Sequence, residues 1–148
     1  MTYDNPMTTD AQLKRLLTDV RTIAVLGIKP ESHAGQPAHD IPEYLMEHGY
    51  EVIPVPVYYP DVTSILGKPV YRSLEAAAKG TGKKIDLVNV FRRSQDVEPH
   101  VEDIIAVKPR AVWMQSGISS AAAAKRLEAE GIEVIQDRCI FVDHRRLM

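Results

Sequence analysis

Short, mostly apolar runs alternate along the chain with segments in which apolar residues recur at helical spacing. The runs are rich in branched residues, which is typical of strands buried on both faces of a parallel sheet. We expect such strands at residues 22–27, 52–55, 85–90, 111–114 and 133–135, with a further edge strand near Val70. Helices are expected between them, at about residues 38–48, 74–79, 95–107 and 119–130. This alternation predicts a doubly wound α/β fold, with a mostly parallel sheet of about five or six strands and helices on both faces.

Before the first strand, Thr9 and Gln12 form a capping-box pattern, which predicts an amphipathic helix that ends near residue 20 and packs on the domain. Pro42 lies inside the next helical segment, where a proline costs about 3 kcal/mol. We therefore expect that helix to begin late, with Asp40 as its N-cap and Pro42 in its first turn. Residues suited to other helix ends are Ser94 and Ser119 as N-caps, and Gly49 and Gly131 as left-handed C-terminal residues.

Composition indicates a single domain over residues 1–148, because 45% of the residues are hydrophobic and can bury a core without disulfides or metals. The 18 basic and 20 acidic residues nearly cancel, so no basic field favours nucleic acid or an anionic membrane. No apolar run is long enough to span a bilayer. Cys139 is the only cysteine, which excludes a disulfide framework and a multi-thiolate zinc site. We expect a cytoplasmic protein that binds a small molecule and no metal.

In open α/β sheets, ligands bind beyond the carboxyl ends of the strands. The first strand is followed by Gly27, Ile28 and Lys29, with Ser32 close behind. The glycine would allow close backbone approach, the lysine would supply a charge, and the following helix would point its positive end at a phosphate. The next glycine is Gly35, so the pattern is not G-x-G-x-x-G, and a simple tight turn between strand and helix remains the alternative.

The second strand ends without the acidic residue that a nicotinamide dinucleotide site places there to bind the ribose hydroxyls. The chain instead reads Pro54, Val55, Pro56 and Val57, which could form a flat wall for an adenine ring. These residues favour an adenine-phosphate ligand over a nicotinamide cofactor.

The third strand is followed by Phe91, Arg92 and Arg93. An arginine can pair with phosphate oxygens through its planar fork of donors, and Phe91 could line an adenine pocket. The alternatives are a solvated pair of charges, an ion pair with Asp96, and a core role for the aromatic ring. The next strand leads into Gln115 and Gly117 before a helix N-terminus, which could hold amide or phosphate groups.

Cys139 follows Asp137 and Arg138 at the end of the last strand. A nearby arginine can lower the pKa of a cysteine and make it reactive, whereas a buried, inert cysteine is the alternative. The chain carries no P-loop, no nucleophile elbow and no pair of catalytic carboxylates.

Taken together, these loops resemble the small stand-alone CoA-binding proteins, which are related to the CoA-binding domain of succinyl-CoA synthetase α-subunits. The resemblance spans residues 21–142, and its most specific parts are AVLG at 24–27, YLMEHGYEVIPV at 44–55, VFRR at 90–93, WMQSG at 113–117 and DRC at 137–139. It implies a Rossmann-like fold with coenzyme A lying across the strand ends.

The resemblance also assigns positions to parts of the ligand. Residues matching the phosphate loop are Gly27, Lys29 and Ser32; those beside the adenosine are Pro54 and Val55; later parts of the binding edge are Val90, Phe91, Arg92, Gln115 and Gly117; and the last motif is Asp137, Arg138 and Cys139. Two departures stand out. Such proteins tend to have Val-Asn-Pro where this chain has Val55-Pro56-Val57, and Pro42 lies in the helix that follows the phosphate loop.

Three hypotheses follow. The first is a non-catalytic module that binds coenzyme A or an acyl-CoA through its 3′-phospho-ADP moiety and senses or carries it. The second is a small acyl-CoA or redox enzyme that uses Cys139, and the third is a nicotinamide-dependent oxidoreductase. A protein partner or a homodimer is left open by the sequence.

Overall fold

A five-stranded parallel sheet forms the centre of the structure, a computed structural model that describes residues 8–148. Residues 1–7, the start of the expected N-terminal segment, lie outside the described residues. The strands are arranged in the order β2-β1-β5-β6-β7, and all neighbours are parallel. Their bounds are β1 (Thr22–Leu26), β2 (Glu51–Val55), β5 (Leu87–Val90), β6 (Ala111–Met114) and β7 (Glu133–Ile135). The predicted fold class is confirmed, with five strands in the main sheet.

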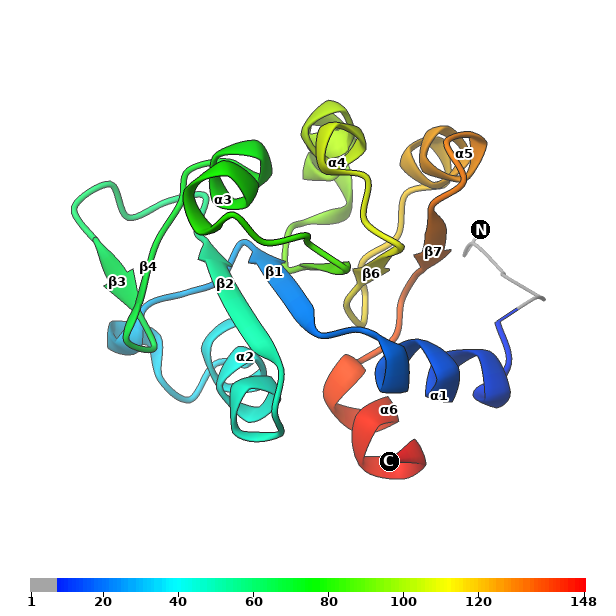
Figure 1. The fold of residues 1–148 in the computed structure, drawn as a ribbon, viewed down its shortest axis with the longest axis horizontal. Coiled ribbons are helices and arrows are strands. Elements are labelled where there is room, and N and C mark those ends of the chain that lie inside the picture. Colours follow the sequence, from blue (N-terminus) through cyan, green and yellow to red (C-terminus); the bar gives the residue numbers. More distant parts are fainter. Residues whose placement is uncertain (1–7) are drawn as a thin grey trace.

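Helices cover both faces of this sheet (Figure 1). One face carries α3 (Leu74–Thr81), α4 (Val101–Val107) and α5 (Ala121–Ala129), and the other carries α1 (Asp10–Asp19), α2 (Pro37–Glu47) and α6 (Ile140–Leu147). Alternate residues of each strand enter different cores: Ala24 and Leu26 pack under α3–α5, whereas Ile23 and Val25 pack under the other helices. Burial on both faces explains why the strands read as apolar runs rather than as alternating patterns.

The strand expected near Val70 does not join the main sheet. β3 (Ser64–Ile65) and β4 (Lys68–Pro69) form a separate antiparallel hairpin, which stands beside β2 in Figure 1. Val70 follows β4, and its N–H donates to the carbonyl of Thr63 at 3.1 Å. The expectation of an edge strand is therefore wrong, because this segment pairs with its own hairpin.

The ends of several helices differ from those that the sequence suggested. Ser120, not Ser119, is the N-cap of α5, because its side chain accepts the N–H of Ala123. Ser94 is not an N-cap either, and its hydroxyl accepts the N–H of Ser119 at 3.0 Å instead. The segment expected as one helix over 95–107 starts with two short 3₁₀ turns, Ser94–Asp96 and Glu98–His100, before α4. The left-handed conformations expected after α2 and α5 are confirmed at Gly49 and Gly131.

α2 begins earlier than expected and contains Pro42 in its interior. Its N-cap is Gln36, and Pro37 occupies the first helical position, where a missing N–H costs little. Pro42 cannot donate to the carbonyl of Ala38, which would otherwise be its partner one turn back. That carbonyl accepts the N–H of Lys29 at 3.1 Å instead. The expectation that α2 begins late, with Asp40 as its N-cap, is therefore wrong. The helix can include Pro42 because the carbonyl that loses its helical partner bonds to the preceding loop instead.

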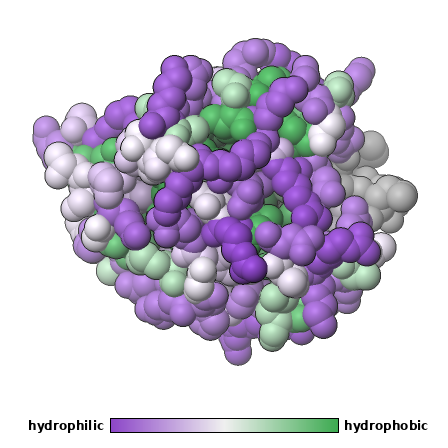
Figure 2. Space-filling view, viewed as in Figure 1, coloured by the Kyte–Doolittle hydropathy of each residue, from purple (hydrophilic) through white to green (hydrophobic). Residues whose placement is uncertain are grey.

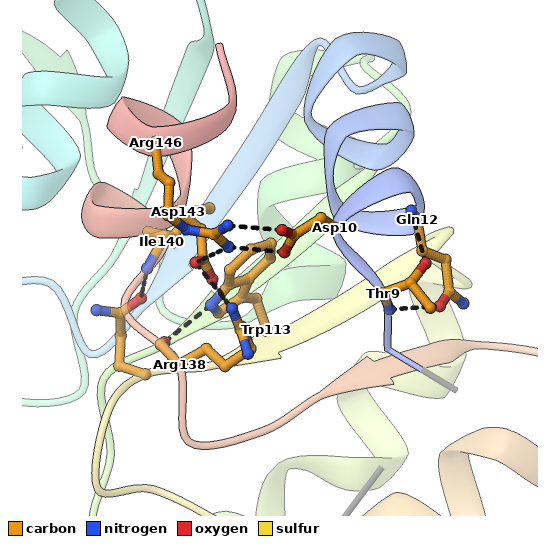
Figure 3. A network of polar contacts seen from close by, with 9 residues as sticks. Thr9, Asp10, Gln12, Trp113, Arg138, Ile140, Asp143 and Arg146 are labelled. Carbon is orange, nitrogen blue, oxygen red and sulfur yellow. Dashed lines mark hydrogen bonds and ion pairs between the residues drawn. The ribbon is translucent and has the colours of Figure 1, made fainter. Parts of the chain in front are cut away.

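The first and last helices are joined by charged side chains (Figure 3). α1 has the predicted capping box at Thr9 and Gln12. α6 was not predicted. Its buried Asp143 accepts two hydrogen bonds from Arg138, at 2.8 and 2.9 Å, and a third from Arg146 at 3.1 Å. Arg146 also binds both carboxylate oxygens of Asp10 on α1, at 2.8 and 2.9 Å.

Hydrophilic side chains cover most of the face seen in Figure 2, and hydrophobic ones are exposed there in small, separate patches. Large hydrophobic residues that are strongly exposed among the described residues are Tyr58, Val142 and Met148. Among residues 8–148, no helix combines the length and apolar composition needed to cross a bilayer.

Replacing Asp143 by alanine should reduce the free energy of unfolding by about 2 kcal/mol, because hydrogen bonds from charged groups contribute about 1.5–3 kcal/mol. Two arginines would lose a partner whose side chain is only 5% exposed. Glu102→Ala is the control, since Glu102 forms an exposed ion pair with Arg126 that should contribute about 0–1 kcal/mol. Urea denaturation of both variants makes the comparison, and equal losses would show that the Asp143 network adds little to stability.

Candidate functional site

A groove opens at the carboxyl ends of β1, β5 and β6. The strand order reverses between β1 and β5, because the chain passes from β1 to the edge strand β2 and then returns to the other side of β1. The loops after β1 and β5 therefore lead to opposite faces of the sheet, and the crevice between them is where ligands bind in such sheets. The groove is lined by Lys29, Gln36, Pro37, Ala38, Phe91, Arg92, Arg93 and Ile118. The structure thus brings together four of the residues predicted from the sequence.

Gly27 lies at the point where the β1 and β5 loops touch. Its φ is +90°, and a Cβ atom there would lie 2.1 Å from the carbonyl oxygen of Phe91. Its N–H donates to the carbonyl of Val55 at 2.9 Å, which also fixes the loop to β2. The predicted close backbone approach at this glycine is therefore made by the Phe91 carbonyl. Contact with a phosphate stays a prediction.

Lys29 is held at both its backbone and its side chain. Its N–H is bonded to Ala38, as described above, and its Nζ donates to Oε1 of Gln36 at 2.7 Å. An ammonium group has donors in addition to the one used by Gln36, so it can also bind an anion in the groove. Ser32 does not line the groove. Its hydroxyl lies 3.0 Å from Nδ1 of His33.

Arg92 is oriented by groups on three sides. Its Nε donates to Nε2 of His100 at 3.2 Å, one terminal nitrogen lies 3.9 Å from Asp96, and the guanidinium carbon lies 5.6 Å from the centre of the Tyr58 ring. Burial lowers the pKa of His100, and the positive charge of Arg92 lowers it further, which favours the neutral ring as an acceptor. Neither His100 nor Tyr58 was among the predicted site residues. Tyr58 lies in the loop after β2, just beyond the predicted Pro54 and Val55, whereas His100 comes from the 3₁₀ turn before α4, away from any strand end.

Arg93 is more exposed than its neighbour, and its Nε donates to Asp96 at 2.7 Å. The ion pair with Asp96 that the sequence left open is therefore present. This pairing lowers the pKa of the Asp96 carboxyl and raises that of the Arg93 guanidinium. Arg93 lines the groove, and because Asp96 takes its Nε donor, the terminal N–H groups are the donors left for a ligand.

Several predicted site residues lie below the surface. Those with buried side chains are Ile28, Pro54, Val55, Val90 and Gln115. Gln115 has a structural role, because its Oε1 accepts hydrogen bonds from Nδ2 of Asn89 at 3.1 Å and from the N–H of Ile140 at 3.2 Å. Burial leaves little side-chain surface for a ligand at these positions, and their part in binding stays a prediction.

The remaining predicted residues lie at the ends of β6 and β7, outside the groove lining. The N–H of Gly117 donates to Oδ1 of Asp137 at 2.6 Å, which joins these two loops. Arg138 turns toward α6 and binds Asp143 with two hydrogen bonds (Figure 3). Cys139 is half-buried immediately before α6. The bonds of Arg138 join the loop after β7 to α6, and any contact of these residues with a ligand stays a prediction.

The chain matches the CoA binding domain family over residues 21–145. It belongs to this family. Family membership supports coenzyme A as the small-molecule ligand, and the groove described above lies within the matched residues. YneT from Bacillus subtilis (strain 168) is 32% identical over 134 residues, which cover 90% of this chain and 93% of YneT.

Solved structures share the fold over nearly the whole chain. Cell-free ID.343 from Thermus thermophilus is 35% identical, with a TM-score of 0.83, and the match covers 95% of this chain and 100% of that one. A hypothetical protein from Pyrococcus horikoshii OT3 is 29% identical, with a TM-score of 0.82 and 99% of both chains covered. These similarities confirm the Rossmann-like fold that the resemblance implied.

Gly27→Ala should reduce the free energy of unfolding by about 3 kcal/mol or more, because a left-handed residue costs about 1–2 kcal/mol and overpacking costs about 1–3 kcal/mol. Gly35→Ala is a matched control, since Gly35 has a φ of +99° but no atom within 4 Å of its added Cβ. Thermal or urea denaturation should therefore show a smaller loss for Gly35→Ala. Equal losses of unfolding free energy would mean that the clash with the Phe91 carbonyl adds no cost of its own.

Proposed function

We propose that this groove binds coenzyme A, or an acyl-CoA, through its 3′-phospho-ADP moiety, and that the protein is a binding or sensor module without chemistry of its own. The observation that carries the proposal is the convergence of Lys29, Arg92 and Arg93 beside Phe91 in one groove at the switch point. Coenzyme A carries a diphosphate and a 3′-phosphate on one adenosine, so several cations beside an aromatic ring suit its chemistry.

The two arginines and the lysine would bind phosphate in different ways. Lys29 offers a compact charge whose position is fixed by Gln36, which suits a diphosphate near the β1 loop. Arg92 has its Nε occupied by His100, so its terminal N–H groups are the donors that remain for a phosphate. The neutral state of His100 matters here because an imidazolium beside Arg92 would repel the guanidinium.

The adenine ring requires a surface, and Pro54 and Val55 are buried within β2. Beyond them the chain rises to the surface at Val57, which is half-buried, and at Tyr58, whose side chain is 63% exposed. We assign the adenine to Val57 and Tyr58 in the loop that follows β2, where the Tyr58 ring already packs on the guanidinium of Arg92.

The two enzymatic alternatives have less support. Arg138, the cation that would activate Cys139, is already paired with Asp143 through two hydrogen bonds. A nicotinamide dinucleotide would meet the end of β2 at Val55 and Pro56, which have no carboxylate for the ribose hydroxyls. The single cysteine suits the reducing cytoplasm in which we place the protein.

Calorimetric titration of ligand-stripped protein with coenzyme A, dephospho-CoA, ADP and NAD should rank coenzyme A first. Loss of the 3′-phosphate should weaken binding about tenfold or more, because a charge-assisted hydrogen bond contributes about 1.5–3 kcal/mol. Equal affinity for coenzyme A and dephospho-CoA would refute recognition of the 3′-phosphate. Tighter binding of NAD than of coenzyme A would favour the oxidoreductase.

Arg92→Gln should weaken coenzyme A binding about ten- to a hundredfold, since it removes a charged partner of a phosphate. Arg126→Gln removes one arginine from the last turn of α5, outside the groove lining, and should leave the dissociation constant unchanged. A similar loss in both variants would mean that net charge rather than the groove governs binding.

A further inference from the structure

His39, near the start of α2, lies between two carboxylates. Its Nδ1 is 3.1 Å from Oδ1 of Asp40, and its Nε2 is 3.4 Å from Oε2 of Glu31, while its side chain is only 4% exposed. The binding proposal makes no use of this residue. Its two carboxylate partners belong to different segments, because Glu31 lies in the β1–α2 loop and Asp40 lies on α2.

Each of these carboxylates also holds a backbone N–H from another turn. Oε2 of Glu31 accepts the N–H of Leu66 at 2.8 Å, in the turn of the β3–β4 hairpin. Oδ1 of Asp40 accepts the N–H of Gly35 at 3.0 Å, in the loop that precedes α2. One imidazole therefore connects the hairpin, the β1–α2 loop and the helix. The same loop carries Lys29 and Gln36 into the groove.

The arrangement requires a charged imidazole. A carboxylate only accepts hydrogen bonds, so both ring nitrogens of His39 must carry protons to satisfy both partners. Burial opposes the charge, but the hydrogen bonds to Asp40 and Glu31 outweigh it and raise the pKa of His39 above its ordinary value. Glu43 adds a third negative charge nearby. The N–H of Leu66 and that of Gly35 keep the pKa values of Glu31 and Asp40 low, so both carboxylates stay ionised.

We infer that the His39 imidazolium is a latch that holds the β1–α2 loop, residues 27–36, against the β3–β4 hairpin, and that coenzyme A binding weakens as His39 loses its proton. This inference rests on the proposed function. A neutral imidazole has one N–H, so one carboxylate would face a ring lone pair and the contact would be repulsive. The loop then has to be ordered during binding, which reduces affinity.

The direction in which coenzyme A affinity changes with pH follows from the linkage between protonation and folding. Because the pKa of His39 is raised by folding, its contribution is complete below the unfolded-state pKa and is lost as pH rises through the folded-state pKa. A phosphate monoester behaves in the opposite way, because its second ionisation near pH 6 adds charge and tightens binding to cations as pH rises. A fall in affinity above neutral pH therefore distinguishes the latch from titration of the ligand.

The test is calorimetric titration with coenzyme A between pH 6.5 and pH 9. We expect affinity to fall about three- to tenfold over this range, since one pKa unit of coupling corresponds to a factor of ten. His39→Gln should remove the fall, whereas His48→Gln, at the exposed end of α2, should keep it. Glu31→Gln retains an oxygen for the N–H of Leu66 but loses a charge, so the fall should move to lower pH. An unchanged pH profile in His39→Gln would overturn the inference.

Amide hydrogen exchange of the ligand-free protein separates this inference from the proposed function. The protection factors of Leu66 and Gly35 should decrease as pH rises and should be low at every pH in His39→Gln. If the wild-type protein binds no coenzyme A, the proposed function is wrong. The latch then cannot control coenzyme A binding. Loss of protection with rising pH would then still support the latch, whereas constant protection would overturn the latch itself.

Discussion

The close approach of the β1 and β5 ends is the constraint on which the groove depends. Gly27 has no side chain, so its backbone can lie against the carbonyl of Phe91, where any Cβ atom would clash. This contact fixes the distance between the two loops that leave the switch point in opposite directions. Lys29 on one loop and Arg92 on the other can therefore line the same groove. The sheet sets the positions of these loops, and the loops supply the charges.

The β1–α2 loop gains its rigidity from an irregular helix rather than from a glycine-rich sequence. Pro42 removes one hydrogen bond from α2, which leaves the carbonyl of Ala38 without its helical partner. That carbonyl accepts a hydrogen bond from the backbone N–H of Lys29 instead. Gln36 then holds the side chain of Lys29. A residue that is unfavourable for a helix in isolation thus contributes to the site, because the lost helical contact is exchanged for a contact between helix and loop.

The sequence predicted the five main strands and the strand-end loops well, because strands covered on both faces have a distinctive composition. It missed α6, since Asp143 and His144 are buried at positions where helical periodicity requires apolar residues. A buried carboxylate can be read as a core residue only when its arginine partners are known, and nothing in the sequence shows that Arg138 and Arg146 pair with Asp143. The same reason applies to Gln115 and Arg138, whose polar groups suggested a ligand site but bind other parts of the chain.

The single tryptophan of the chain lies beneath α6 and reports on its packing. Trp113 is fully buried in β6, and its indole N–H donates to the carbonyl of Arg138 at 2.9 Å, immediately before that helix (Figure 3). Release of α6 would expose the indole to water and break this hydrogen bond. A conformational change confined to the groove would leave the indole buried and the hydrogen bond in place. The protein therefore contains an intrinsic fluorophore that distinguishes detachment of the last helix from changes in the loops above the sheet.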